Sequence, residues 1–214
     1  MYLVNDIYLT IHGEGRRYGI PHVFVRFALC NLTCSFCDTE YESYTEMTGE
    51  DIYARAVELT KDFHVPPEKT RSGAVVKGES TVIPRPCRNV LFCGGEPLLQ
   101  LDKELLGLFS HWFTVVETNG TCAIPEGLDW VTCSPKVAEH AIVPDHVQEL
   151  KYVRGINQPI PRPRCQADNY LISPMFMATD VPNDVIQWCI KLVLENPQWA
   201  LTVQHQKVSY GDLK

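Results

Sequence analysis

The sequence has no long hydrophobic run. No stretch of about 18 apolar residues occurs, and a membrane-spanning helix needs about that length. The content of 45% hydrophobic and 21% charged residues is that of an ordinary globular protein. A chain of 214 residues is long enough for one well-buried core and short for two. We therefore expect a single domain over residues 1–214 that has no contact with a membrane.

A secretory signal is also missing at the N-terminus. Residues Met1 to Asp6 contain neither the basic stretch nor the apolar stretch of a signal peptide, so we expect a cytoplasmic protein. That compartment is reducing, and the nine cysteines are odd in number and scattered along the chain. Both features argue against a disulfide framework and favour thiolate ligands together with free buried thiols.

Positive charge is scarce. Lys and Arg number 19 against 26 Asp and Glu, which gives a formal net charge of −7. Nucleic-acid affinity rests largely on Lys and Arg side chains that neutralise phosphates. The charge balance therefore disfavours a nucleic-acid partner, and a small-molecule substrate fits better.

Hydrophobic periodicity predicts many strands. Apolar side chains occupy nearly every second position in residues 3–11, and the alternation returns in residues 23–29 after a Gly-rich turn. Short apolar runs bounded by turn residues predict further strands at 89–93, 113–117, 130–133, 147–153, 170–172 and 199–203.

Helices are fewer. Residues Thr48 to Asp51 resemble a capping box, and apolar residues at helical spacing behind it predict a helix to about Phe63. Two more helices are predicted at 102–111 and 183–195. Strands that alternate with helices early, and later follow one another with few helices between them, suggest an α/β fold. We expect a mostly parallel sheet curved into an incomplete, helix-poor barrel.

Residues 64–89 interrupt this pattern with many Pro, Lys and Arg residues. Apolar runs at 74–76 and 81–83 flank Lys77 to Ser80, which could form a hairpin. We interpret 64–89 as a surface insertion within the domain.

Three cysteines lie close together, because Cys30, Cys34 and Cys37 form a C-x3-C-x2-C pattern. A structural zinc site takes four protein ligands, so three would leave one position open. A cubane 4Fe-4S cluster has four irons, and three cysteines leave one iron free for another molecule. A disulfide loop is a third reading. With Phe36 just before the last cysteine, the segment resembles the cluster loop of radical S-adenosylmethionine (SAM) enzymes, in which SAM chelates the free iron.

Polar motifs follow three of the predicted strands. Gly94 to Pro97 reads Gly-Gly-Glu-Pro, in which the glycines would let the backbone approach a ligand and Glu96 could accept from an ammonium group. Glu117 to Gly120 and Ser134 to Lys136 end two later strands, and the carboxyl ends of parallel strands form one rim. Singly, each motif is an ordinary loop pattern. After the cysteine loop, the first resembles the motif that contacts the SAM amino group in radical SAM enzymes.

A longer set of motifs follows one order along most of the chain. They are His12–Gly15, Arg26–Phe27, Cys37–Thr39, Gly94–Pro97, Glu117–Gly120, Ser134–Lys136, Glu149–Lys151 and the end from Trp199 to Lys207. In this order they resemble the 7-carboxy-7-deazaguanine synthase family of radical SAM lyases. The insertion lies outside the match.

The resemblance implies a homodimer of incomplete radical SAM barrels. It implies conversion of 6-carboxy-5,6,7,8-tetrahydropterin to 7-carboxy-7-deazaguanine with loss of ammonia, in the synthesis of queuosine and related 7-deazapurines. The implied cofactors are a 4Fe-4S cluster, SAM and Mg2+, with an external, flavodoxin-like electron donor. The reduced cluster would cleave SAM to a 5′-deoxyadenosyl radical that takes hydrogen from C6 of the pterin.

The resemblance also assigns site residues. The cluster ligands would be Cys30, Cys34 and Cys37, and the Mg2+ ligand Thr39. The SAM contacts would be Phe36, Gly95, Glu96, Glu117, Asn119, Ser134, Pro135, Lys136, Ser173, Pro174, Met175 and Phe176. The substrate contacts would be Ile11, His12, Gly13, Glu14, Arg26, Cys93 and Gln206.

Residue chemistry leaves two of these assignments with alternatives. Asp38 and Thr39 offer the oxygen donors that Mg2+ prefers, but an Asx or ST turn that closes the loop explains them as well. Arg26 interrupts an apolar run. Its side chain is either exposed on the other face of the strand or buried, where its guanidinium would pair with a carboxylate. A carboxylated pterin favours the second reading.

The sequence departs from the family pattern on the substrate side. Cys93 stands where members commonly have Thr, and His12 stands where they have Gln. The usual Gln-Thr-His-Lys near the end becomes Gln204 to Lys207, read Gln-His-Gln-Lys. Because a shift of one residue turns a side chain to the opposite face of a strand, we do not expect His205 to replace the usual histidine.

Two other functions compete with the synthase. A glycyl-radical-enzyme activase, or a radical SAM enzyme with a different substrate, would share the cluster and SAM motifs. An activase, however, needs neither a carboxylate clamp at Arg26 nor Mg2+ near Thr39. A non-enzymatic zinc-binding module is the third candidate.

Overall fold

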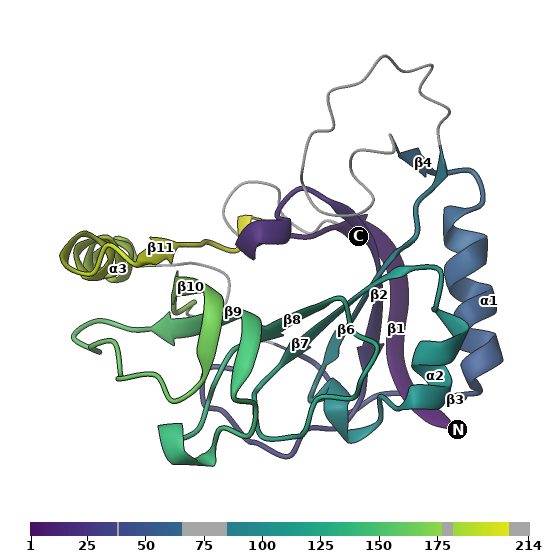
Figure 1. Cartoon of the computed structure of the whole chain (residues 1–214), viewed down its shortest axis with the longest axis horizontal. Helices are drawn as coiled ribbons and strands as arrows, with labels where there is room; N and C mark the ends of the chain where they lie inside the picture. The colour runs from purple at the N-terminus through teal and green to yellow at the C-terminus, as the bar shows by residue number, and fades with distance from the viewer. Residues whose placement is uncertain (38, 66–84, 177–181, 206–214) are drawn as a thin grey trace.

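The structure is a computed structural model that describes residues 1–37, 39–65, 85–176 and 182–205. Its main feature is a nine-stranded sheet in the order β11-β10-β9-β8-β7-β6-β2-β1-β3 (Figure 1). The strands are β1 (Tyr2–Ile11), β2 (Pro21–Phe27), β3 (Thr45–Met47), β6 (Asn89–Gly94), β7 (Phe113–Thr118), β8 (Trp130–Cys133), β9 (His146–Arg154), β10 (Gln166–Pro174) and β11 (Trp199–Leu201). The helices are α1 (Gly49–Thr60), α2 (Lys103–Leu108) and α3 (Asn183–Glu195), with 3-10 turns at Gly15–Arg17, Pro97–Leu99 and Glu139–Ala141.

Most of the sheet is parallel. Every neighbouring pair from β2 to β11 runs parallel, whereas β1 is antiparallel to both β2 and β3. The outer strands β3 and β11 do not pair with each other, so the sheet stays open. Parallel neighbours are usually joined through a helix. In the described chain, α1, α2 and α3 lie in the connections β2–β6, β6–β7 and β10–β11, whereas β7–β8, β8–β9 and β9–β10 are joined without an α-helix.

The helices lie toward the two ends of the sheet (Figure 1). Helices α1 and α2 contact each other, and α1 packs on β1 and β2. At the other end α3 packs beside β10 and β11. The middle strands β7, β8 and β9 are thereby left to loops, which is the helix-poor arrangement that the sequence predicts.

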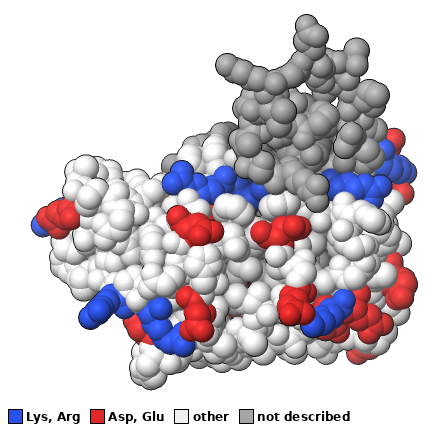
Figure 2. All heavy atoms as spheres, viewed as in Figure 1, with Lys and Arg blue, Asp and Glu red and all other residues white. Residues whose placement is uncertain are grey.

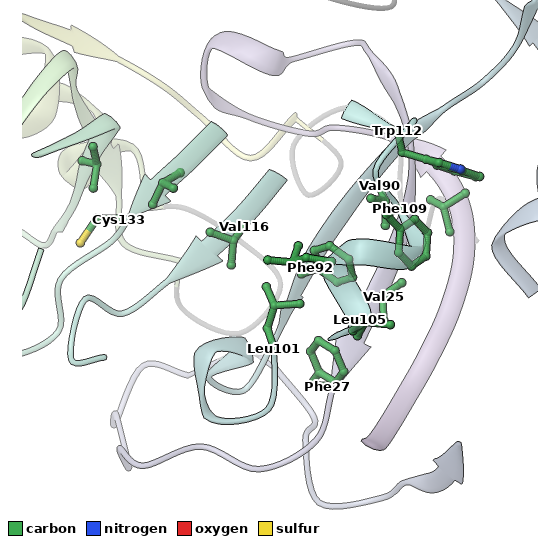
Figure 3. Close-up of a cluster of buried hydrophobic side chains, with 14 of the residues drawn as sticks. Val25, Phe27, Val90, Phe92, Leu101, Leu105, Phe109, Trp112, Val116 and Cys133 are labelled. Atoms are coloured by element: carbon green, nitrogen blue, oxygen red, sulfur yellow. The ribbon is translucent and has the colours of Figure 1, made fainter. Parts of the chain in front are cut away.

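The main core runs along the sheet and includes residues of α1, α2 and α3; Figure 3 shows the part around Phe92 and Phe109. Phe27 of β2 stacks on Phe92 of β6 with centroids 6.2 Å apart, and Phe92 meets Phe109 edge to face at 5.6 Å. Successive strand residues point to opposite faces of a sheet. Arg26 and Cys93, which neighbour these aromatic residues in the chain, therefore point away from the helices.

Helix α1 begins as predicted and ends earlier. Thr48 and Asp51 form the reciprocal hydrogen bonds of a capping box. Ile52 and Ala56 are fully buried, but the helix ends at Thr60. The predicted continuation to Phe63 is wrong, and that side chain is 39% exposed because it lies beyond the last helical turn.

The remaining elements differ from prediction mainly at their ends. Strand β10 starts at Gln166, four residues before its predicted start. The prediction missed these first residues because most are polar and they lack an alternating apolar pattern. The short edge strand β3 was not predicted, since Thr45–Met47 carries little apolar character. Strands β4 (His64–Val65) and β5 (Arg85–Pro86) pair at the base of the insertion. The hairpin predicted around Lys77 to Ser80 lies outside the described residues.

Charged side chains are spread over the visible surface. On the face drawn in Figure 2, Lys and Arg are interspersed with Asp and Glu among uncharged residues. Of the helices that the structure describes, none is both long enough and apolar enough to span a bilayer.

Candidate active site

A pocket opens at the carboxyl ends of the parallel strands. Its walls come from the cysteine loop after β2, the ends of β6 to β10, the turn after β1 and the segment after β11. The predicted site residues that line it are Glu14, Cys30, Cys34, Phe36, Cys37, Thr39, Cys93, Gly95, Glu117, Asn119, Ser134, Lys136, Ser173, Pro174 and Phe176. The structure thus brings residues from the SAM, metal and substrate sets into one cavity.

The cysteine loop supplies three thiols to this pocket. Cys30, Cys34 and Cys37 all line it, and all nine cysteines of the chain are free. Burial raises the pKa of Cys34, the charge of Lys136 opposes this rise, and Cys37 and Cys30 add to it. The three sulfur atoms are therefore near enough to influence one another.

These thiols fit a cluster better than a single ion. Among the described residues, no three His, Cys, Asp or Glu side chains converge on one point where an ion would bind. A cubane does not need this convergence, because each cysteine binds a different iron atom. Three free thiols on one wall are the donor set that a 4Fe-4S cluster with one open iron requires.

The Gly-Gly-Glu-Pro turn packs against the cysteine loop. Gly95 N donates to Phe27 O at 3.1 Å, and Glu96 N donates to Leu29 O at 2.9 Å. A Cβ atom at Gly94 would collide with the backbone of Phe27, and one at Gly95 with Leu29 O. The sequence predicts that these glycines leave room for a ligand, whereas the structure uses them for close contact between two loops.

Glu96 lies beneath the pocket wall. Its side chain is 0% exposed and is absent from the lining. The carboxylate accepts from Leu98 N at 3.0 Å, Thr118 Oγ1 at 2.8 Å and Asn119 N at 2.7 Å. Burial raises the pKa of Glu96 in spite of these hydrogen bonds. The carboxylate joins the turns after β6 and β7, so a contact between Glu96 and SAM would come from its backbone.

Two polar residues of the predicted SAM set are held by neighbouring groups. Asn119 Nδ2 donates to Asn31 Oδ1 of the cysteine loop at 3.0 Å. Lys136 Nζ donates to Ser134 Oγ at 2.6 Å and lies 5.8 Å from the centre of the Phe36 ring. Burial and the nearby charge of Lys151 lower the pKa of Lys136 to about 8.

A network of charged side chains forms another part of the pocket wall. Lys151 Nζ lies 2.7 Å from Glu14 Oε1 and 4.0 Å from Glu117 Oε1. His12 Nε2 lies 2.9 Å from the same Glu117 oxygen. Burial alone would lower the pKa of Lys151, but Glu117 and Glu14 raise it above its usual range. The ammonium group of Lys151 is thus held charged between two carboxylates.

Two residues of the predicted substrate set lie behind the lining. His12 is only 2% exposed and contacts Glu117, so it meets the pocket through that carboxylate. Arg26 lies on the pocket side of the sheet beside Cys93, its register partner on β6. Burial raises the pKa of Tyr8 to about 12, Cys93 adds to the rise, and a hydrogen bond from Arg26 offsets part of it. No ion pair among the described residues includes Arg26.

The other predicted contacts are more distant or undescribed. Ile11 ends β1, and Gly13 O accepts from His205 N at 3.1 Å, but neither residue lines the pocket. Pro135 and Met175 line a second hollow that shares Phe36, Lys136 and Val153 with the first. Gln206 and Asp38 lie outside the described residues.

Comparisons with known proteins identify the family. No family model matches the chain. A 7-carboxy-7-deazaguanine synthase from Bradyrhizobium diazoefficiens is 35% identical in an alignment of length 222 that covers 96% of this chain and 97% of the relative. The chain belongs to the 7-carboxy-7-deazaguanine synthase family.

Other relatives agree. A 7-carboxy-7-deazaguanine synthase from Bacteroides thetaiotaomicron is 31% identical over 212 residues, 96% of each chain. The crystal structure of QueE from Escherichia coli superposes with a TM-score of 0.64 at 20% identity, covering 95% of this chain and 93% of that one. This likeness confirms the incomplete, helix-poor radical SAM fold. Membership of the family confirms the resemblance, the enzyme class and the cofactor pair of a 4Fe-4S cluster and SAM.

For a 7-carboxy-7-deazaguanine synthase family member, the structure adds pocket residues beyond the site residues assigned from the sequence. They are Leu32, Gly94, Thr118, Lys151, Val153 and Gln204. Lys151 belongs to the Glu149–Lys151 family motif. Because side chains alternate along a strand, the charged residues Glu149 and Lys151 lie on the same face. That pairing is a signal that could have identified Lys151. Gln204 gave no such signal, because its partner Glu14 is 190 residues away in the chain.

Proposed function

We propose that this chain converts 6-carboxy-5,6,7,8-tetrahydropterin to 7-carboxy-7-deazaguanine with loss of ammonia, in the synthesis of queuosine-type 7-deazapurines. The observation that carries the proposal is that one pocket contains both kinds of group this reaction needs. Three free cluster-loop thiols line one wall, and the charged residues Glu14, Glu117 and Lys151 line another. Family membership supports the same reaction.

The cofactor half of the pocket would hold the cluster through Cys30, Cys34 and Cys37. When bound, the cluster and SAM supply the radical chemistry that removes hydrogen from C6 of the pterin. Lys136 and Ser134, joined by a hydrogen bond of 2.6 Å, offer donors to SAM, and Glu117 offers an acceptor. The adjoining hollow beside Phe36 is lined by apolar side chains such as Met175 and suits an adenine ring.

The substrate half would use Arg26, Cys93 and Glu14. Arg26 carries a positive charge on the pocket side of the sheet, and a guanidinium binds a carboxylate through two parallel hydrogen bonds. It would therefore take the carboxylate of the pterin. Cys93 separates Arg26 from Glu117 across the sheet, since β6 lies between β2 and β7.

Further features belong to the same proposal. The Thr39 hydroxyl in the pocket wall would bind Mg2+, which prefers few protein oxygens together with water and substrate. An external flavodoxin-like protein would reduce the cluster, and two copies would form a homodimer. Free thiols suit the reducing cytoplasm. The continuous sheet supports one domain that carries the 64–89 insertion.

A direct assay tests the proposed reaction. Anaerobically reconstituted enzyme, incubated with SAM, a reductant, Mg2+ and the carboxytetrahydropterin, should release 7-carboxy-7-deazaguanine that mass spectrometry detects. Chelating Mg2+ should slow the reaction, and Cys34→Ala should abolish both cluster absorbance and turnover. Formation of 5′-deoxyadenosine without the deazaguanine would leave the radical SAM class intact and rule out the named substrate.

A further inference from the structure

Two buried oxygen atoms on one wall of the pocket have no hydrogen-bond partner in the part of the chain that the structure describes. They are Glu14 Oε2 and Gln204 Oε1, and neither finds a donor among the described residues. Both residues line the pocket, and Glu14 is only 6% exposed. A buried acceptor without a donor is energetically unfavourable, because it has lost its hydrogen bonds to water. The two oxygens therefore mark a place where a ligand supplies the donors.

The hydrogen bonds to the Glu14 carboxylate determine how the Gln204 amide is oriented. Glu14 Oε1 is already bound by Lys151 Nζ at 2.7 Å and by Gln204 Nε2 at 3.2 Å. A carboxylate can only accept hydrogen bonds, so the amide nitrogen of Gln204 must face it. The amide oxygen of Gln204 and the second oxygen of Glu14 are then both left as acceptors.

The chain on both sides holds this pair in place. Thr202 Oγ1 accepts from Gly15 N at 2.8 Å, and His205 N donates to Gly13 O at 3.1 Å. These bonds tie the segment after β11 to the turn after β1 on either side of the Glu14–Gln204 contact. The His205 ring packs on the Tyr18 ring with centroids 4.1 Å apart, outside the pocket lining. Gln204, and not His205, is the residue that this segment presents to the pocket.

We propose that Glu14 and Gln204 form an acceptor pair that binds the donor edge of a 2-amino-4-oxopyrimidine ring, namely its ring N–H and its exocyclic amino group. The inference rests on the proposed function, because a pterin carries this edge. It makes Gln204 a specificity-determining residue and Lys151 the residue that positions Glu14.

The arrangement of charges across the sheet agrees with this orientation. Lys151, which holds Glu14, is on β9, whereas Arg26 is on β2, with β6, β7 and β8 between them. The acceptor pair and the guanidinium therefore stand on different walls. A pterin has its amino-pyrimidine edge at one end and its 6-carboxylate at the other. The donor edge would meet the acceptor pair, and the carboxylate would meet the guanidinium of Arg26.

Two ligands that differ at one position test the proposal. The first is 6-carboxypterin, and the second is 6-carboxylumazine, in which a carbonyl replaces the 2-amino group. Binding to anaerobically reconstituted enzyme with SAM and Mg2+ is measured by ultrafiltration and the fluorescence of the free ligand. A site built from acceptors should bind the pterin about tenfold more tightly, because the lumazine carbonyl would face two oxygens.

Three variants distinguish the loss of the Gln204 acceptor from a general disruption of the site. Gln204→Met keeps the size of the side chain and removes its acceptor, so the preference should fall to about threefold or less. Gln198→Met, the same change at an exposed position outside the pocket, should keep the full preference. Glu14→Gln can present an amide N–H, and it should shift the preference toward the lumazine. Cluster absorbance and SAM binding check that each variant keeps an intact site.

The binding and turnover results test the acceptor pair and the proposed reaction separately. A wild-type enzyme without preference, or a Gln204→Met variant that keeps it, overturns the acceptor pair even if 7-carboxy-7-deazaguanine is formed. A preference that only Gln204→Met and Glu14→Gln change supports the pair. Failure of the proposed function is read separately, from the absence of deazaguanine in the turnover assay.

Discussion

Arg26 and Lys151 both carry positive charge on the pocket side of the sheet, but their surroundings differ. Lys151 has a carboxylate 2.7 Å away in Glu14 and a second at 4.0 Å in Glu117. Arg26 has no ion-pair partner among the described residues. A partly buried charge that lacks a partner is costly in the free protein. A carboxylate from a bound ligand would supply the anion that the described residues do not provide.

Replacing Arg26 with alanine should weaken binding of 6-carboxypterin by about 2–5 kcal/mol, the usual cost of removing one partner of a buried charge pair. Pterin without the carboxylate should bind the variant and the wild type alike, because it lacks the group that Arg26 contacts. Anaerobic ligand-binding measurements on both compounds check this. Equal affinity of the two proteins for 6-carboxypterin would remove Arg26 from the substrate site.

His22 is a buried histidine with a structural role. Arg17 Nε donates to His22 Nε2 at 3.4 Å, and His22 Nδ1 lies 2.9 Å from Ile20 O. An imidazole that accepts with one nitrogen and donates with the other is neutral. Burial, together with the charges of His12 and Arg17, lowers the pKa of His22 to about 3. The ring supports the turn after β1 only while it is uncharged.

This buried ring predicts a stability that falls with acid. The unfolded chain binds a proton at His22 below about pH 6.5, while the folded chain excludes it until about pH 3. The contribution is therefore complete above pH 6.5 and is lost as the pH falls from there. Relative to His22→Asn, whose amide does not titrate, the wild type should lose up to about 1.4 kcal/mol of unfolding free energy per pH unit. Urea unfolding at pH 7 and pH 5 measures this; parallel losses in both proteins would contradict it.

At the scale of elements, the cysteine loop and the turn after β6 form one unit. Two backbone hydrogen bonds join them, and glycine at both 94 and 95 permits the close approach. Glu96 then connects this unit to the turn after β7 through Thr118 and Asn119. The loop that would hold the cluster is thus positioned by the turns of two neighbouring strands.

Gly95→Ala should separate these elements, because its Cβ would collide with Leu29 O. We expect less iron per chain after reconstitution, together with lower thermal stability. Gly107→Ala is the matched control: apart from its chain neighbours and the local helix backbone, no described atom lies within 4 Å of the added Cβ, and alanine favours helix α2 by about 0.5–1 kcal/mol. Full cluster content in Gly95→Ala would contradict the docking role.

The elements that could be predicted from the sequence are those with a local pattern. The strands that start at Asn89, Phe113 and Trp130 are short apolar runs, and α1 has its capping box at Thr48. Strand β3 and the first residues of β10 carry no such pattern. They are strands because the neighbouring strands β1 and β9 supply hydrogen bonds, which is tertiary information.

At the scale of the whole molecule, the sequence predicts polar motifs at the ends of the strands, and the structure brings these motifs to one pocket. The motifs at Cys30, Gly95 and Ser134 meet there because parallel strands share one carboxyl edge. Roles that depend on distant partners were not predictable. The burial of Glu96 follows from Thr118 and Asn119, and the contact of Gln204 follows from Glu14 at the other end of the chain.

The meeting of the two ends of the described chain sets an order for assembly. Gly15 bonds to Thr202, and Glu14 bonds to Gln204, although 187 and 190 residues separate them. A ribosome makes the cysteine loop early and the segment after β11 late. During translation the nascent chain therefore exposes the thiols of its cysteine loop while one wall of the pocket is still missing. A chain that has not yet been extended to Gln204 lacks this wall, so the pocket could shield a reactive radical only after that residue has been made.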